Sequence, residues 1–178
     1  PYFNPSYTTN GNPLLENQFS PTPAVPRHLS ANLQLIDSKY NPTEFSLKEE
    51  KDQEKHSRFF IIKSYSKEDV IRSIRHNVWC STEAGNAKLN DVFVGKSANT
   101  SIYLLFSVNG SGQFCGMAEM ISKVDFESKC EIWTQDKWRG KFEIKWIFVK
   151  DIPNMKFKHI LLPNNENKPV TNSRDVQE

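Results

Sequence analysis

The pattern of hydrophobic and polar residues differs between the first part of the chain, residues 1–56, and the rest. Residues 1–56 show neither a helical nor a strand period, and seven of the ten prolines fall before residue 43. Such a segment cannot bury enough apolar surface to offset the entropy of ordering it. We therefore expect residues 1–56 to form a largely flexible arm with a charged linker, and residues 57–178 to fold.

The beginning of the folded part predicts one strand followed by two helices. Residues 58–63 form a short apolar run between polar residues, as in a buried strand. Ser66 precedes two acidic residues and a set of apolar residues at helical spacing, so a helix should begin there. A second helix is expected from residue 84 or 86 through residue 93, with Gly95 ending it.

The rest of the folded part predicts strands. Residues 102–108 and 114–120 flank Asn109-Gly-Ser-Gly112, which is a strong hairpin signal because Asn and Gly tolerate positive φ. Residues 141–150 alternate, and one face carries four large residues: Phe142, Ile144, Trp146 and Phe148. Residues 157–162 are the expected final strand. The order of elements predicts an α/β (α+β) domain on a mixed, curved sheet.

The charge changes sign along the chain. Residues 1–56 hold five basic and seven acidic side chains, a net charge of −2. The whole chain carries +2, so residues 57–178 hold eighteen basic and fourteen acidic side chains, or +4. A modest positive excess permits phosphate binding without proving it.

The cysteines and the lack of long apolar runs limit the cellular setting. Cys80, Cys115 and Cys130 have no CxxC spacing and leave an odd thiol, which argues against a disulfide scaffold or a zinc site. No apolar run approaches the roughly 18 residues of a membrane span. The first residues lack the pattern of a secretory signal. We expect an intracellular protein with no membrane contact.

Signatures of enzymes are missing from the sequence. The four histidines are scattered, and none is spaced with a cysteine or carboxylate as metal ligands are. Nucleophile-elbow, phosphate-loop and deaminase motifs do not occur. Cys80 would need a basic partner to act as a nucleophile, and a buried thiol is the favoured interpretation. We therefore expect no catalytic residue, no metal and no cofactor.

The four tryptophans are not equivalent. Trp146 lies on the alternating face of a strand and is expected in the core. Trp133 and Trp138 lie five residues apart in a polar segment near basic side chains, which suits a platform for stacked bases. Both rings could instead tuck under the loop against the core. Trp79, between the two helices, is equally open to both interpretations.

Five segments together resemble successive signatures of the YTH family of RNA-binding domains. They occur in the family's order and cover nearly the whole chain from Arg58 onwards. The segments are Phe60-Ile-Ile-Lys-Ser-Tyr-Ser66, Trp79-Cys-Ser-Thr-Glu-Ala-Gly-Asn86, Leu105-Phe-Ser-Val-Asn-Gly-Ser-Gly-Gln-Phe-Cys-Gly116, Trp133-Thr-Gln-Asp-Lys-Trp138 and Asn165-Glu-Asn-Lys-Pro-Val-Thr-Asn-Ser-Arg-Asp175.

The resemblance implies an open, barrel-like mixed sheet of six strands flanked by helices, which reads N6-methyladenosine in single-stranded RNA. Trp79, Trp133 and Trp138 match the three walls of the family's aromatic cage. Because N6-methyladenine is neutral, such a cage works by stacking and apolar enclosure.

The resemblance also assigns polar contacts to the base. Asp69 matches the acidic residue that meets the ring edge near N1. The backbone N–H of Tyr65 would donate to N3, and the carbonyl of Cys80 would accept from the methylated N6–H. Ser64 belongs to the same base-binding set.

A second set of residues would hold the RNA backbone. It comprises Lys63, Lys88, Arg174 and Asp175, although ordinary surface charge is the alternative for the basic members. The chain departs from the family at Lys88, where Arg is frequent, and at Ala87, where Lys or Arg is common. The family's domain usually continues into a C-terminal helix beyond the segment that matches Gln177-Glu178.

Asp69 and Trp138 make the chain most similar to the cytoplasmic-type readers, which implies a cytoplasmic location and leaves a nuclear one open. We expect a monomer that binds N6-methyladenosine-containing mRNA. Its low-complexity arm would recruit protein effectors of mRNA decay or translation. Two alternatives stay open: a module of the same fold that reads an unmodified RNA motif, and a nucleic-acid-processing enzyme.

Overall fold

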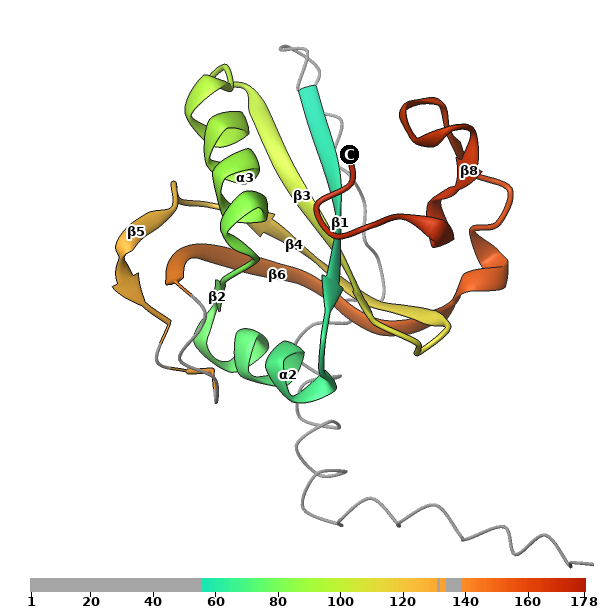
Figure 1. Cartoon of the computed structure of the whole chain (residues 1–178), viewed down its shortest axis with the longest axis horizontal. Coiled ribbons are helices and arrows are strands. Elements are labelled where there is room, and N and C mark those ends of the chain that lie inside the picture. The colour runs from blue at the N-terminus through green and yellow to red at the C-terminus, as the bar shows by residue number, and fades with distance from the viewer. Residues whose placement is uncertain (1–55, 131, 134–138) are drawn as a thin grey trace, which may run out of the picture.

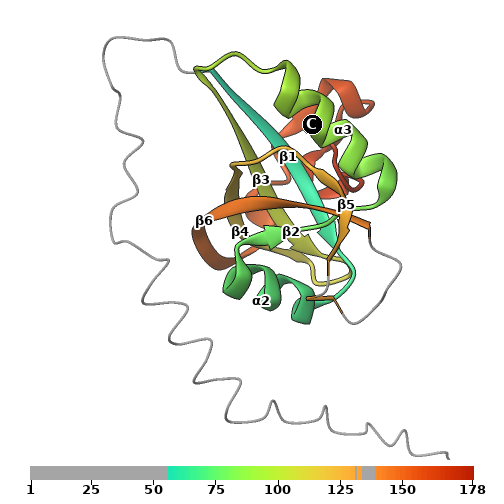
Figure 2. The ribbon, with the colours of Figure 1, turned by 90° about the vertical axis from the view of Figure 1, so that its left-hand side faces the viewer.

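A six-stranded mixed sheet with two helices forms the centre of the computed structural model, which describes residues 56–130, 132–133 and 139–178 (Figures 1 and 2). The expected arm, apart from His56, and Trp138 lie outside the described residues. The elements, in chain order, are β1 (His56–Ser64), α2 (Lys67–His76), β2 (Val78–Trp79), α3 (Glu83–Gly95), β3 (Thr100–Val108), β4 (Gln113–Met120), β5 (Asp125–Lys129), β6 (Arg139–Pro153), η1 (Asn154–Lys156), β7 (Leu161–Leu162), η2 (Pro163–Asn165), β8 (Lys168–Pro169) and η3 (Val170–Asn172).

The sheet combines one parallel pair with antiparallel neighbours. The strand order is β1-β3-β4-β6-β2, and β5 pairs with β6. β1 runs parallel to β3, while β3, β4 and β6 pair antiparallel in succession. A parallel pair needs a crossover connection, and here α2, β2 and α3 supply it. The expected fold class and the mixed sheet of six strands are confirmed.

α2 begins where the sequence predicts, and α3 begins at Glu83, one residue before the earlier of its two expected starts. The Ser66 hydroxyl accepts a hydrogen bond from the backbone N–H of Asp69, 3.1 Å away, and so caps α2. Thr82 caps α3 in the same way, through the N–H of Gly85 at 3.1 Å. The hairpin between β3 and β4 is also confirmed, with Gly110 and Gly112 at φ of 75° and 70°.

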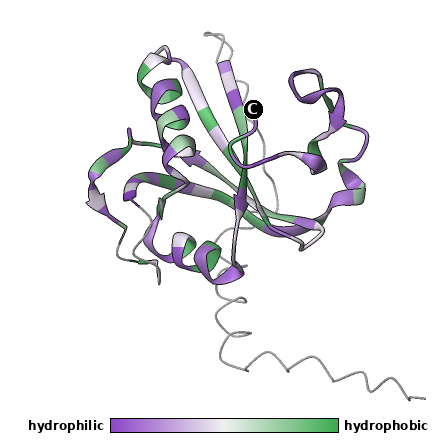
Figure 3. Ribbon diagram, in the orientation of Figure 1, coloured by the Kyte–Doolittle hydropathy of each residue, from purple (hydrophilic) through white to green (hydrophobic). Residues whose placement is uncertain are grey.

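The core lies between the sheet and the two helices. Most of its fully buried side chains come from alternate positions of β1, β3 and β6, among them Phe60, Phe106 and Phe142, and α3 adds Leu89. Trp146 is buried as expected, and its indole N–H donates to the Ser73 hydroxyl on α2 at 3.3 Å. The central strands carry hydrophobic residues in Figure 3, whereas the segment after β6 is mostly hydrophilic.

The expected face of β6 is correct for three of its four residues and wrong for Phe148. Ala118 of β4 pairs with Trp146, but the preceding residue, Met117, pairs with Phe148, so β6 holds one extra residue at this point. Such a bulge reverses the alternation of side chains beyond it. Val149 therefore packs against the buried cluster, while Phe148 is only half-buried.

The prediction of a strand over residues 157–162 is also wrong. Only Leu161 and Leu162 are extended, and they pair with Pro169 and Lys168 of β8 in a separate two-stranded sheet. Before them the chain turns: the N–H of Phe157 donates to the carbonyl of Asn154, and that of Ile160 to the carbonyl of Phe157, each at 3.0 Å. These short-range bonds take the place of the strand ladder.

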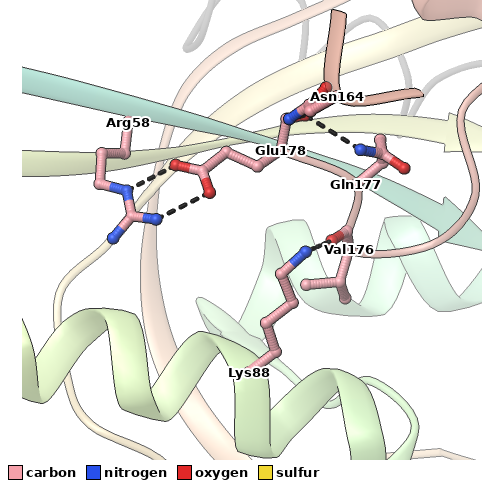
Figure 4. Close-up of polar contacts among 6 residues, drawn as sticks. All are labelled: Arg58, Lys88, Asn164, Val176, Gln177 and Glu178. Carbon is pink, nitrogen blue, oxygen red and sulfur yellow. Dashed lines mark hydrogen bonds and ion pairs between the residues drawn. The ribbon is translucent and has the colours of Figure 1, made fainter. Parts of the chain in front are cut away.

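The last described residues lie against β1 and form hydrogen bonds with it (Figure 4). The N–H of Ile61 donates to the carbonyl of Gln177 at 2.7 Å, and the N–H of Val176 donates to the carbonyl of Ile61 at 2.8 Å. Arg58 on β1 forms a two-pronged ion pair with Glu178, with N···O distances of 2.6 and 2.7 Å. This C-terminal hook, residues 174–178, joins the end of the described chain to its first strand.

We predict that the ion pair gives the domain a small stability contribution that disappears in acid. Its hydrogen bonds to Arg58 lower the pKa of Glu178 below the ordinary value of 4.5. A lowered folded-state pKa stabilises the fold above the unfolded pKa, and this stabilisation is lost as the pH falls through the folded value. Both side chains are more than a third exposed, 39% and 35%, so screening limits the effect to about 0.5 kcal/mol.

The measurement is the free energy of unfolding of the wild type and Glu178→Gln at neutral and acidic pH. The difference between the two proteins should be present at neutral pH and vanish in acid. Glu166→Gln is the control, because it removes a pair with Lys168 whose side chains are 78% and 50% exposed. An equal loss in both variants at neutral pH would contradict a special role for the hook.

Candidate functional site

A cleft opens where β1 ends, and segments distant in the chain meet around it. Its walls come from the end of β1, the first turn of α2, β2, the start of α3, residue 133 and the C-terminal hook. The empty space amounts to about 320 Å³, including the open mouth. The lining residues are Lys63, Ser64, Tyr65, Asp69, Trp79, Cys80, Ser81, Thr82, Trp133 and Asp175.

Every described residue that the sequence assigns to base binding lines this cleft. These residues are Ser64, Tyr65, Asp69, Trp79, Cys80 and Trp133. Of the four assigned to the RNA backbone, Lys63 and Asp175 line it too, whereas Lys88 and Arg174 do not. The predicted third tryptophan, Trp138, lies outside the described residues.

Two indole rings meet nearly at right angles in the wall of the cleft. The ring centroids of Trp79 and Trp133 are 5.2 Å apart, with an interplanar angle of 74°. Behind them, the ring of Phe106 lies edge-on to Trp79 at 4.9 Å. Trp79 and Trp133 are only 5% and 7% exposed, so both belong to the core as well as to the cleft. The interpretation that these rings pack against the core is confirmed for Trp79 and Trp133, and the same two residues line the cleft.

Backbone contacts hold Trp133 in this position. Arg72 of α2 donates from Nη1 to the carbonyl of Ile132 at 2.9 Å, and the N–H of Trp133 donates to the carbonyl of Cys130 at 3.2 Å. The indole N–H of Trp79 is buried and has no hydrogen-bond partner in the described part of the chain. A buried donor of this kind needs an explanation, and a place in a binding site is one.

Buried polar contacts shape the backbone around Cys80. The side chain of Asn86, which is fully buried, accepts from the N–H of Ser81 and donates to the carbonyl of Arg139, each at 2.9 Å. Burial raises the pKa of the Cys80 thiol above its ordinary value, although a hydrogen bond from Asn86 opposes this. The thiol is therefore protonated at neutral pH, which disfavours Cys80 as a nucleophile.

The carboxylate of Asp175 bridges two walls of the cleft. Its Oδ1 accepts from the backbone N–H of Lys63 at 2.8 Å, and its Oδ2 accepts from the hydroxyl of Ser81 at 2.7 Å. Burial lowers the pKa of Lys63, while the charge of Asp175 opposes that shift. Lys63 also donates from Nζ to the Ser107 hydroxyl at 3.3 Å. The rim of the cleft thus carries a positive and a negative side chain next to the two indoles.

The remaining lining residues come from the junction between β1 and α2. The Ser64 hydroxyl is buried and donates to the carbonyl of Ser66 at 2.8 Å, which holds the turn. Asp69 lies in the first turn of α2, and its backbone N–H donates to the capping hydroxyl of Ser66. Tyr65, between them, is 68% exposed. One short turn therefore presents a carboxylate and an aromatic side chain at the same edge.

Sequence reasoning missed four residues that shape the site: Arg72, Ser81, Thr82 and Asn86. Ser81 and Thr82 lie inside a recognised segment, directly after Cys80, so their position carried a usable signal. Arg72 and Asn86 act on residues 60 and 53 positions away. No local pattern could have revealed these contacts.

Two classes of site are absent from the described ranges. Residues 56–130, 132–133 and 139–178 contain no helix long and apolar enough to cross a membrane. Within the same ranges, no three His, Cys, Asp or Glu side chains gather as metal ligands would.

The chain is similar to known proteins over most of its length. Residues 57–178 match the family described as YTH, the YT521-B-like domain. Human YTH domain-containing family protein 2 is 53% identical over 157 residues, which is 88% of this chain and 26% of the relative. Human YTH domain-containing family protein 3 is 56% identical over 139 residues, 78% of this chain and 23% of the relative. The chain thus spans about a quarter of the length of these curated relatives.

Solved structures with the same fold include complexes. The YTH domain of the Zygosaccharomyces rouxii MRB1 protein, in complex with N6-methyladenosine RNA, superimposes with a TM-score of 0.67 at 43% identity and covers 76% of this chain and 83% of that chain. The Pho92 YTH domain in complex with m6A gives a TM-score of 0.67 at 38% identity, with 76% and 80% covered.

We predict that Gly85 cannot be replaced by alanine without disturbing the cleft. Alanine is the better helix former by about 1 kcal/mol. A Cβ on Gly85, however, would lie 2.3 Å from the Ser81 hydroxyl and 2.9 Å from Cγ2 of Val176. The Ser81 hydroxyl would have to leave Asp175, so Gly85→Ala should destabilise the domain by about 1–3 kcal/mol.

Gly95, at the other end of α3, is the matched control because a Cβ there meets nothing within 4 Å. Gly95→Ala should be neutral or slightly stabilising. Chemical denaturation of both variants measures the difference. Equal stability of the two variants would show that the contact between α3 and the hook is loose.

Proposed function

The chain belongs to the family of YT521-B-like (YTH) domains, and we propose that it binds N6-methyladenosine in single-stranded RNA through the cleft at the end of β1. The domain acts as a reader and catalyses no reaction. The observation that carries this proposal is the pair of indoles, Trp79 and Trp133, which meet at 74° in the wall of the cleft beside Asp69.

The two rings suit a flat, neutral, methylated base. One indole stacks on the purine while the other encloses the methyl group, and stacking of a base on an aromatic ring is worth about 1–3 kcal/mol. Both rings are fixed by the core, so little entropy is lost when they bind. Trp138, which lies outside the described residues, completes the cage in this proposal.

Polar groups at the edge of the cleft select adenine. Asp69 meets the ring edge near N1, the backbone N–H of Tyr65 donates to N3, and the carbonyl of Cys80 accepts from the methylated N6–H. Ser64 supports this set by holding the turn between β1 and α2. Bases with a different pattern of donors and acceptors would leave these groups unpaired, which is a strong basis for rejection.

The methyl group adds a modest preference. Burying one methyl is worth about 0.8 kcal/mol, and unmodified adenine would also leave part of the cage without contacts. Together these terms give an affinity ratio of roughly tenfold between methylated and plain RNA. Lys63 and Arg174 contact phosphates, which strengthens binding without reading the sequence, and Asp175 orients the rim beside them.

The proposal extends to the wider role of the protein. In this proposal the ligand is N6-methyladenosine-containing mRNA, and the segment of residues 1–56 recruits protein effectors of mRNA decay or translation. The protein acts as a monomer in the cytoplasm. The complexes of similar YTH domains with N6-methyladenosine RNA and with m6A support the choice of ligand.

The test of the reader function is a titration against two short single-stranded RNAs that differ by one N6-methyl group, at fixed salt. We predict a roughly tenfold preference for the methylated strand in the wild type. Trp133→Ala should bring the ratio close to one, because the second wall is lost. Phe126→Ala, which removes an exposed ring on β5, is the control and should keep the preference.

Thermal melting shows whether Trp133→Ala still folds, and Trp133→Phe keeps a ring in place if it does not. Equal binding of the two strands by the wild type would refute methyl reading. An unmodified sequence motif would then be the ligand to seek.

Arg174 gives a prediction of a different kind. Its side chain is exposed at the start of the hook and does not line the cleft. Arg174→Ala should weaken the binding of methylated and plain RNA by the same factor, and the slope of log K against log salt should become shallower by about 0.7. Arg75→Ala, on the last turn of α2, should change neither quantity. A selective loss of methylated binding in Arg174→Ala would contradict a phosphate contact.

A further inference from the structure

The side chain of Lys88 contacts the backbone of the C-terminal hook and does not line the cleft. From α3, its Nζ donates to the carbonyl of Val176 at 2.8 Å and lies 5.6 Å from the centroid of the Phe60 ring (Figure 4). Arg58 chiefly, and Lys88 to a smaller degree, lower the pKa of Glu178. The ammonium of Lys88 therefore already has a carbonyl, a ring face and a nearby carboxylate as partners within the protein.

The residue that Lys88 holds has an unfavourable backbone conformation. Val176 has a φ of 53°, a left-handed value that a β-branched residue rarely adopts. Such a conformation persists only where neighbouring contacts enforce it. Here the N–H of Val176 donates to the carbonyl of Ile61, its carbonyl accepts from Lys88, and its side chain is 4% exposed.

The strained residue directly follows the carboxylate that bridges the cleft. Asp175 accepts from the N–H of Lys63 and from the hydroxyl of Ser81, and both of these residues line the cleft. The direction in which the Asp175 side chain leaves the backbone depends on how Val176 is held. A contact at the Val176 carbonyl can therefore determine the position of a group in the binding site.

We propose that Lys88 is a positioning residue of the RNA-binding cleft: it holds Val176 in the left-handed conformation and so places the Asp175 carboxylate between Lys63 and Ser81. This inference rests on the proposed RNA-binding function. It replaces the phosphate contact that the family resemblance implies for Lys88, because the ammonium already donates to the carbonyl of Val176 within the protein.

The chain offers a matched control directly after the end of the same helix. Lys96, the residue that follows α3, donates from Nζ to the carbonyl of Thr100 at 3.0 Å and lies 5.0 Å from the centroid of the Phe93 ring. It makes the same two kinds of contact as Lys88 but does not touch the hook. Lys88→Met and Lys96→Met therefore remove the same charge and the same type of hydrogen bond at two places.

The first experiment uses the free protein and measures amide hydrogen exchange. The N–H of Lys63 is bonded to Asp175 and that of Ile61 to Gln177, so both should exchange roughly tenfold faster in Lys88→Met. Amides in the middle of β3 should not change, and Lys96→Met should leave Lys63 and Ile61 as they are. Unchanged exchange of these two amides in Lys88→Met would overturn the proposal.

The second experiment measures binding of the methylated RNA at several salt concentrations. Lys88→Met should weaken binding severalfold while the slope of log K against log salt stays that of the wild type. A slope shallower by about 0.7 would identify Lys88 as a phosphate ligand and overturn the proposal, and so would wild-type affinity despite faster exchange. If the wild type itself does not bind this RNA, the proposed function fails, while the exchange result still decides whether Lys88 holds the hook.

Discussion

The carboxylate of Asp175 joins two segments of the cleft that are far apart in the chain. Its two oxygens accept from Lys63 at the end of β1 and from Ser81 at the start of the loop into α3. Hydrogen bonds to a charged acceptor are about twice as strong as those between neutral groups. The walls of the cleft therefore depend on a residue from the C-terminal hook, which in turn depends on β1.

The indoles of the cleft belong to the same buried cluster as the core of the sheet. In the proposed function, this arrangement makes the surface of the cleft rigid before any ligand arrives, which limits the entropy that binding costs. It also links binding to stability, since removal of Trp79 leaves a hole next to Phe106, and removal of Trp133 leaves one next to Trp79. Substitutions of Asp69 or Tyr65 at the rim should change binding with less effect on stability, because these residues contribute little to the core.

Local patterns predicted β1, the two helices and the hairpin, because each had its own signal, but they missed the two-residue strand β2. Ser66 and Thr82 cap helices, and Gly110 and Gly112 allow the turn. The errors lie where pairing with another strand decides the outcome. The bulge opposite Ala118 turns Phe148 away from the core, and short turns replace the expected strand before Leu161. Family signatures brought together the lining residues, but they could not show that Lys88 contacts Val176 or that Arg72 holds Ile132. Those contacts depend on the finished fold.

The pairing of the hook with β1 has a consequence for synthesis on the ribosome. β1 is the first described strand to emerge, and its partner β3 follows only after α2, β2 and α3. Asp175 and Gln177, which complete the rim and the bridge to Ile61, emerge more than a hundred residues later. At about 5–20 residues per second, a nascent chain carries its tryptophans for several seconds before the cleft can close around them. The cleft is therefore completed only after the strands and helices that support it have emerged.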